Sequence, residues 1–246
     1  MAPAAGNGPY YRRDLARIHH EGFAFHADAC AQDIVALLEP VRRDGIVVEL
    51  GCGSGLLTRH LCEAAFRVIA TDASPAMLDI ARQHAFGALE YRRLTLPSDP
   101  IPAADAIVSV GHALSYLDDA ASVDRALVAI AAALRPGGLM AIDLCDVEWG
   151  RARENESIKC WRTDEWVLIT EFSLPSPDRY VREMTTFVRH PDGSWRRDDE
   201  RHDNVLLDTS VIPALLADHG VEASVSTSFG GAELPVGLVA IVGRKI

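Results

Sequence analysis

The sequence predicts an α/β protein built on a doubly wound, mostly parallel sheet, with an antiparallel meander inserted late in the chain. Two observations carry this prediction. Short apolar runs alternate with helical patterns over residues 45–145, and polar residues alternate with apolar ones over residues 160–207. The first pattern favours right-handed βαβ units around a parallel sheet. The second is typical of antiparallel strands with one exposed face.

The elements can be assigned in order from the N-terminus. Residues 33–38 supply an apolar helical face and Pro40 follows them, so one or two helices are expected before residue 45. Further helices are expected at 56–61, from an N-cap at Ser74 with Pro75 in the first turn, and at 121–135. Strands of the parallel part are expected at 45–50, 67–71, 89–94, 105–110 and 139–143.

Turn residues divide the meander into separate strands. The strands are expected at 161–163, 166–172, 180–189 and 195–207, with turn chemistry at 175–178 and 191–193. A helix at 209–219 and strands at 221–229 and 236–244 then close the chain. The resulting division is an N-terminal helical lid (1–44), a ligand-binding core (45–148 and 208–246) and inserted strands (149–207).

Composition excludes several classes of protein. The 246 residues carry 24 Lys plus Arg against 35 Asp plus Glu, a net charge of −11, which argues against a protein that binds nucleic acid mainly through its phosphates. The five cysteines contain no C-x-x-C pair, so neither a metal site nor a disulfide framework is expected. No secretory signal or run of about 18 apolar residues occurs, so we expect a cytoplasmic protein without a membrane partner.

A glycine-rich turn marks the candidate binding site. The first strand leads into Glu49-Leu-Gly51-Cys-Gly53-Ser-Gly55, and a helix follows. Glycines let the backbone turn sharply and approach a ligand, and the helix start offers free N–H groups. Asp72 ends the second strand about 20 residues later, the spacing at which an acid accepts hydrogen bonds from ribose hydroxyls. Together they predict an adenosine-like ligand.

The segment VVELGCGSG, with Asp72 and SPAML after it and LRPGG before the fifth strand, resembles the class I S-adenosylmethionine-dependent methyltransferases. The resemblance implies a Rossmann-like seven-stranded sheet, mostly parallel with its last strand antiparallel, and S-adenosyl-L-methionine as cofactor. It implies a cofactor site made by Glu49, Gly51, Cys52, Gly53, Gly55, Asp72, Ala73, Met77, Thr95, Leu96, Gly111 and Tyr11. Within it, Glu49 and the glycine loop would hold the methionine part, and Asp72 the ribose.

The turn after the third strand departs from the family pattern. An Asp often stands there to accept the adenine amino proton, whereas this chain has Leu94-Thr95-Leu96. Thr95, a backbone carbonyl or a water would have to take that role. An NAD-binding oxidoreductase is the rival interpretation, but its fingerprint requires a glycine where Leu56 stands. A purely structural glycine turn is a further alternative.

The loop GHALSYL at 111–117 and the meander resemble small-molecule methyltransferases, and among them the sugar-amine N-methyltransferase branch. That resemblance implies a small-molecule acceptor methylated at nitrogen or oxygen, with inserted strands that roof the site and often pair subunits into a homodimer. Two alternatives stay open: a non-catalytic cofactor-binding module, and a nucleic-acid methyltransferase. The net charge, and GHAL in place of an Asn-Pro-Pro-Tyr-like motif, argue against the latter.

His112 and His20 are the candidate catalytic residues, because imidazole titrates near neutral pH. A purely packing role for His112 is equally open. His19, Tyr10 and Tyr11 are further candidates in the lid, whereas Tyr116 is expected to pack. The arginines of the meander are expected to form a solvated, ion-paired face, with a groove for an anionic substrate as the alternative: Arg179, Arg182, Arg189, Arg196, Arg197 and Arg201.

Overall fold

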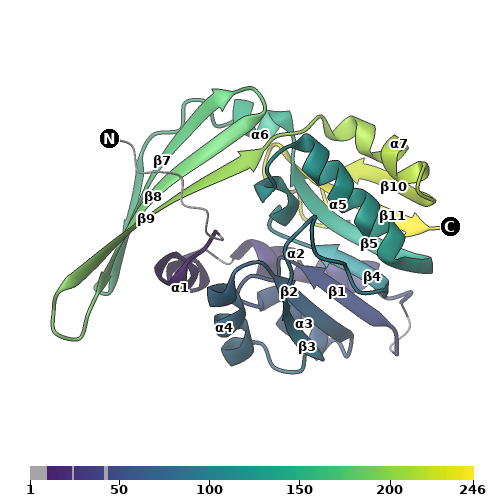
Figure 1. Ribbon diagram of the computed structural model, residues 1–246, viewed down its shortest axis with the longest axis horizontal. Coiled ribbons are helices and arrows are strands. Elements are labelled where there is room, and N and C mark those ends of the chain that lie inside the picture. Colours follow the sequence, from purple (N-terminus) through teal and green to yellow (C-terminus); the bar gives the residue numbers. More distant parts are fainter. Residues whose placement is uncertain (1–9, 24, 42–43) are drawn as a thin grey trace.

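The computed structural model describes residues 10–23, 25–41 and 44–246. Residues 1–9, which begin the expected lid, lie outside the described residues. Two sheets form two separate layers of strands (Figure 1). The larger sheet carries the glycine loop, and the smaller one is the expected meander.

The larger sheet has seven strands in the order β10-β11-β5-β4-β1-β2-β3. Its pairs are parallel except at β11, which runs antiparallel to both β5 and β10. This confirms the expected doubly wound, Rossmann-like fold with an antiparallel end. The strands are β1 (Ile46–Leu50), β2 (Arg67–Asp72), β3 (Glu90–Arg93), β4 (Ala104–Ser109), β5 (Leu134–Cys145), β10 (Val221–Ser226) and β11 (Leu238–Lys245).

Helices cover both faces of this sheet. On one face, α2 and α3 pack against apolar side chains of β1 and β2, including Val47 and Val68. On the other, α5 and α7 pack against Val48 and Ile107. The helices are α2 (Phe25–Leu37), α3 (Leu56–Glu63), α4 (Pro75–His84), α5 (Ala120–Ala133), α6 (Val147–Arg151) and α7 (Ile212–Ala217), with 3-10 turns η1 (Ala113–Tyr116) and η2 (Thr209–Val211).

The expected stop signal Arg135-Pro-Gly-Gly138 is not a loop between helix and strand. Helix α5 ends at Ala133, and β5 begins at once. Leu134 pairs with Ala104 whereas Leu139 pairs with Ala106, so the intervening residues form an irregularity within the strand. Gly137, with φ of 78°, supplies the left-handed residue that this bend needs.

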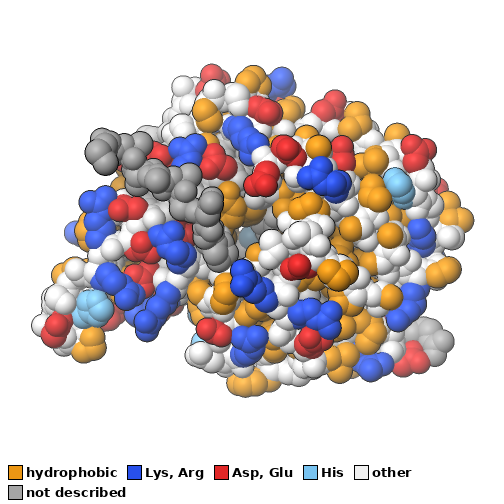
Figure 2. All heavy atoms as spheres, in the orientation of Figure 1, with side chains coloured by type: hydrophobic (Ala, Val, Ile, Leu, Met, Phe, Trp, Pro, Cys, Tyr) orange, Lys and Arg blue, Asp and Glu red, His pale blue; other side chains and the backbone are white. Residues whose placement is uncertain are grey.

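The smaller sheet contains four antiparallel strands in the order β6-β7-β8-β9. They are β6 (Lys159–Arg162), β7 (Trp166–Ser176), β8 (Arg179–Arg189) and β9 (Trp195–Val205). Acidic and basic side chains are interspersed over much of the visible surface (Figure 2), and on this sheet the exposed Arg201 pairs with Glu183 at 3.0 Å. The expected solvated, ion-paired face is therefore confirmed for Arg201 and Arg197, but not for Arg182, which is largely enclosed.

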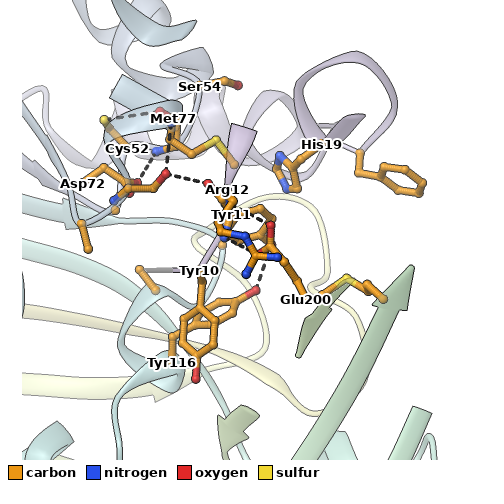
Figure 3. Close-up of a pocket in the computed structure, with 18 of the residues that line it drawn as sticks. Tyr10, Tyr11, Arg12, His19, Cys52, Ser54, Asp72, Met77, Tyr116 and Glu200 are labelled. Atoms are coloured by element: carbon orange, nitrogen blue, oxygen red, sulfur yellow. Dashed lines mark hydrogen bonds between the residues drawn. The ribbon is translucent and has the colours of Figure 1, made fainter. Parts of the chain in front are cut away.

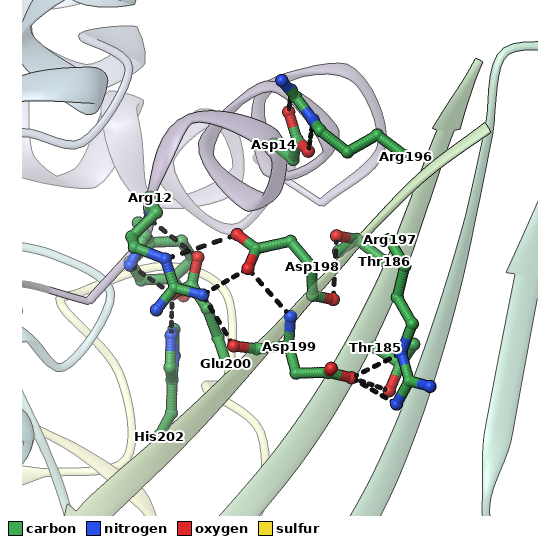
Figure 4. Close-up of polar contacts among 11 residues, drawn as sticks. Arg12, Asp14, Thr185, Thr186, Arg196, Arg197, Asp198, Asp199, Glu200 and His202 are labelled. Carbon is green, nitrogen blue, oxygen red and sulfur yellow. Dashed lines mark hydrogen bonds and ion pairs between the residues drawn. The ribbon is translucent and has the colours of Figure 1, made fainter. Parts of the chain in front are cut away.

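Helix α1 (Arg13–Gly22) joins the two layers. Leu15 and Ile18 pack against Trp166 and Leu168 of the smaller sheet, while the helix also contacts α4 of the core. Arg196 of β9 donates to the Asp14 carboxylate at 2.9 Å (Figure 4), which fixes the helix to that sheet. In the described ranges, no helix is both long and apolar enough to cross a membrane.

Candidate functional site

The glycine loop after β1 forms the floor of the site. Gly51, Gly53 and Gly55 all have left-handed φ, at 68°, 53° and 85°. A Cβ on Gly51 would lie 2.4 Å from the Cβ of Ala113, so only glycine fits there. A Cβ on Gly53 would meet nothing within 4 Å, so the backbone at this point faces open space.

Asp72, at the end of β2, ties two loops together (Figure 3). One carboxylate oxygen accepts from the N–H of Gly53 at 2.8 Å, and the other accepts from the N–H of Ser74 at 2.7 Å. Burial raises the pKa of this carboxyl. A carboxylate has about four acceptor positions, so Asp72 keeps capacity for two ligand hydroxyls.

A cavity of about 1140 Å³ opens above this floor, between the carboxyl ends of β1, β2 and β4 and the smaller sheet. Parallel sheets bind ligands at this edge, at the point where the strand order reverses. The structure brings most of the expected cofactor residues together in the cavity wall: Tyr11, Gly51, Cys52, Gly53, Asp72, Ala73, Met77, Thr95, Leu96 and Gly111.

Glu49 and Gly55, in contrast, do not line the cavity. Glu49 is 3% exposed and accepts from the hydroxyl of Thr58 at 2.5 Å, so it braces α3 from beneath the loop. Burial raises the pKa of Glu49 to about 8. Gly55 is the N-cap of α3. Their expected cofactor contacts stay predictions.

The turn after β3 uses an acid that the sequence pattern does not single out. Asp99 accepts from the N–H of Thr95 at 2.7 Å. This carboxylate therefore fixes the turn rather than lining the cavity, whereas Leu94, Thr95 and Leu96 do line it. The wall expected beside adenine is accordingly apolar apart from Thr95.

The two candidate catalytic histidines lie outside the cavity lining. The ring of His20 faces that of His84, with centroids 4.5 Å apart. The ring of His112 stacks on Tyr116, and burial, followed by the nearby Arg182 guanidinium, lowers the pKa of His112 to about 3. Their proposed catalytic roles stay predictions. His19, on α1, does line the cavity, and burial lowers its pKa to about 4.

An N-terminal strap, defined here as Tyr10–Arg12, crosses the cavity toward the smaller sheet. The Glu200 carboxylate of β9 accepts from the N–H groups of Tyr11 and Arg12, both at 2.8 Å (Figure 4). The hydroxyl of Ser74 donates to the carbonyl of Tyr11 at 2.7 Å. Tyr11 has φ of 57°, a left-handed conformation that these three contacts maintain.

Sequence reasoning missed the pair His26–Asp143. His26 lines the cavity, and its Nε2 lies 2.8 Å from a carboxylate oxygen of Asp143 at the end of β5. Asp143 also accepts from the backbone N–H groups of Gly111 and His112. Burial opposes the charge on His26, but hydrogen bonds to Asp143 and Cys30 outweigh it and raise the pKa to about 10. The loop after β4 is thus held by the Asp143 carboxylate, which pairs in turn with His26.

Sequence reasoning also missed Arg182, Glu200 and Tyr116 as parts of the site. Tyr116 lines the cavity, and its hydroxyl lies 2.9 Å from that of Tyr11 and accepts from Arg182. One signal was available for Arg182: it shares a strand face with Tyr180 and Met184, so the period of two turns it inward. Among the described residues, no group of three potential metal ligands occurs.

Comparison with known proteins supports this geometry. A protein family described as a methyltransferase domain matches residues 47–138, the segment from β1 into β5. The ubiquinone biosynthesis O-methyltransferase of Methylocella silvestris is 32% identical over 136 residues, which is 53% of this chain and 48% of that relative. The match therefore spans about half the length of the relative.

Solved structures resemble the chain over nearly its whole length. An S-adenosylmethionine-dependent methyltransferase from Clostridium acetobutylicum has a TM-score of 0.78 at 17% identity, covering 94% of this chain and 97% of that one. The sugar N-methyltransferase KedS8 from Streptoalloteichus has a TM-score of 0.76 at 21% identity, covering 100% and 97%. At these identities the likeness concerns the fold, which includes the smaller sheet. Residues 47–138 of this chain thus match a methyltransferase domain, and the chain as a whole shares the fold of an S-adenosylmethionine-dependent methyltransferase.

Proposed function

We propose that this protein transfers a methyl group from S-adenosyl-L-methionine to a nitrogen or oxygen atom of a small molecule. The observation that carries the proposal is the pairing of the glycine loop with Asp72 at the floor of a large cavity. The backbone at Gly53 faces open space, and the neighbouring carboxylate has free acceptor capacity. These are the features that a nucleoside cofactor needs at the carboxyl ends of β1 and β2.

The residues present fit that cofactor. The N–H groups of the loop and the start of α3 would bind its carboxylate end, and Asp72 its ribose hydroxyls. Ala73 and Met77 on one side, with Leu94 and Leu96 on the other, would enclose the adenine ring. When bound, the cofactor supplies an activated methyl on a sulfonium for in-line displacement.

The chain would contribute alignment and exclusion of water. The strap and α1 cover the cavity from the N-terminal side, and the smaller sheet covers it from the other. An amine acceptor must lose a proton before or during the reaction. His19 lines the cavity, but burial lowers its pKa to about 4, so it is a weak base and the acceptor would have to enter already deprotonated.

Both acceptor atoms stay open, because the relatives include an O-methyltransferase and a sugar N-methyltransferase. The net charge of −11 favours a small acceptor over nucleic acid. A homodimer through β6–β9, a lid formed by residues 1–44 and a cytoplasmic location remain our predictions. Light scattering after gel filtration tests the first, and cell fractionation tests the last.

Calorimetry with S-adenosylmethionine and with its demethylated product tests the proposal. Saturable binding is expected, and Asp72→Ala should weaken it roughly tenfold or more by removing charge-assisted hydrogen bonds. Asp79→Asn is the matched control, because Asp79 is an exposed acid of α4 that pairs with Arg82 at the surface. Absence of saturable binding by the wild type would sink the proposal. Binding without turnover over a broad panel of amines and phenols would favour a non-catalytic module.

A further inference from the structure

A cluster of buried polar side chains lies behind the hydroxyls of Tyr11 and Tyr116, between the smaller sheet and the core. Its members each have a buried nitrogen without a hydrogen-bond partner in the described part of the chain. These nitrogens are Nδ1 of His19, His112 and His202, Nε of Arg182 and Nδ2 of Asn204. Buried polar atoms are normally hydrogen-bonded, so five such atoms in one region indicate a missing partner.

Arg182 is the charged member of the cluster. Its Nη2 donates to the Tyr116 hydroxyl and lies 3.3 Å from the Asn204 amide oxygen. Within residues 10–23, 25–41 and 44–246, no carboxylate lies within ion-pair distance of its guanidinium, although every exposed arginine of β9 has one. Enclosing a guanidinium without a counter-ion is costly, and the cost is recovered when an anion binds.

The neighbouring histidines do not neutralise this charge. Burial and the Arg182 guanidinium lower the pKa of His19 to about 4 and that of His202 well below its usual value, so both are neutral at pH 7. The carboxylate on the same sheet face, Glu200, already accepts from two strap N–H groups and from Nε2 of His202 (Figure 4). Burial raises the pKa of Glu200 to about 7. Arg182 is therefore a permanent positive charge to which no carboxylate of the described residues is directly paired.

The cluster adjoins the cavity through the two phenols. Tyr11 and Tyr116 line the cavity, and their hydroxyls lie 2.9 Å apart (Figure 3). On the side away from the cavity, the Tyr116 hydroxyl accepts a hydrogen bond from Nη2 of Arg182. A ligand group that replaces the Tyr116 hydroxyl at Nη2 would also reach the free Nε, because these two atoms form one edge of the guanidinium.

We propose that Arg182 is the specificity-determining residue for a methyl acceptor that bears a carboxylate. That carboxylate would bind the Nε–Nη2 edge of the Arg182 guanidinium, beside Asn204 and His202. This rests on the proposed function and adds the acceptor class. A carboxylate matches the edge with two parallel hydrogen bonds and one negative charge. A phosphate dianion would leave a second negative charge buried against neutral histidines. The rest of the acceptor would occupy the cavity near Gly111.

Acetate and acetamide are the probes, because they have the same shape and differ in charge. Their methyl signals are followed by NMR on the full chain, with and without the demethylated cofactor. Acetate should bind saturably and acetamide should not. Arg182→Met should weaken acetate binding tenfold or more, since it removes two charge-assisted hydrogen bonds. Arg189→Met, an exposed arginine on the same strand, is the control and should leave acetate binding unchanged.

Several outcomes would overturn the inference: equal binding of acetate and acetamide, acetate binding that Arg182→Met leaves intact, or inorganic phosphate that binds more tightly than acetate. If Arg182→Met does not fold, Arg182→Lys keeps the charge but loses the planar edge, and should still lose acetate affinity. Wild-type affinity in Arg182→Lys would refute the role of the edge. Acetate binding is also measured without the cofactor, so the acetate result stands even if the protein fails to bind the cofactor.

Discussion

Glu49 offers the sharpest test of the electrostatics beneath the glycine loop. Glu49 is 3% exposed, and its carboxyl accepts a hydrogen bond from the Thr58 hydroxyl at 2.5 Å. Desolvation raises its pKa from 4.5 to about 8, the Thr58 hydrogen bond opposes the rise, and the charge of Asp72 adds to it. The native protein therefore keeps Glu49 protonated at pH values where the unfolded chain ionises it.

The sign of the pH effect follows from this difference. Stability contributed by protonated Glu49 is complete below pH 4.5 and is lost as the pH rises through about 8. A pKa rise of this size corresponds to about 5 kcal/mol between the protonation states. Between pH 5.5 and pH 9, the wild type should lose about 3 kcal/mol of unfolding free energy through this one group.

Glu49→Gln removes the ionisation and keeps the shape and an acceptor for Thr58. Urea unfolding followed by circular dichroism should find the variant close to the wild type at pH 5.5 and more stable by about 2–3 kcal/mol at pH 9. Glu63→Gln, at an exposed position of α3, the helix that carries Thr58, is the matched control and should show no such trend. A difference between Glu49→Gln and wild type that does not change with pH would refute the reasoning.

Three further predictions concern the site. His26→Gln should lower the unfolding free energy by about 1–3 kcal/mol below pH 6.5, and this deficit should fade as the pH rises through about 10, where wild-type His26 loses its proton. Urea unfolding across that pH range measures the deficit. A deficit that does not change with pH would contradict the charge assigned to His26. Gly53→Val should weaken binding of the demethylated cofactor at least tenfold in calorimetry, because the side chain fills the open space and φ of 53° disfavours it; unchanged affinity would place the cofactor elsewhere. Glu200→Gln should lower the free energy that holds the strap in place by about 1–3 kcal/mol, since an amide nitrogen cannot accept from the Tyr11 N–H. Trypsin should then cut after Arg12 faster than in the wild type or in the exposed control Glu165→Gln.

Local sequence signals predicted the core of the molecule well. Strands β1, β2, β4 and β5 are rich in apolar residues, most of them buried, as is typical of strands covered on both faces of a parallel sheet. The glycine loop and Asp72 were predictable for a related reason. Left-handed backbone at Gly51 and Gly53 is a local requirement, and the carboxyl ends of adjacent parallel strands meet at one edge by topology alone.

The sequence by itself determined the order of elements, the doubly wound sheet and the floor of the site, because each depends on residues within one βαβ unit. Only the tertiary structure decided what closes the cavity. Tyr11 and Glu200 are 189 positions apart, and no local pattern relates them. From the sequence, Arg182 is expected at the surface with the other arginines of the meander. In the structure, its contact with Tyr116 and the packing of α1 enclose it. Charge burial depends on which distant segments meet, and that is a property of the folded chain.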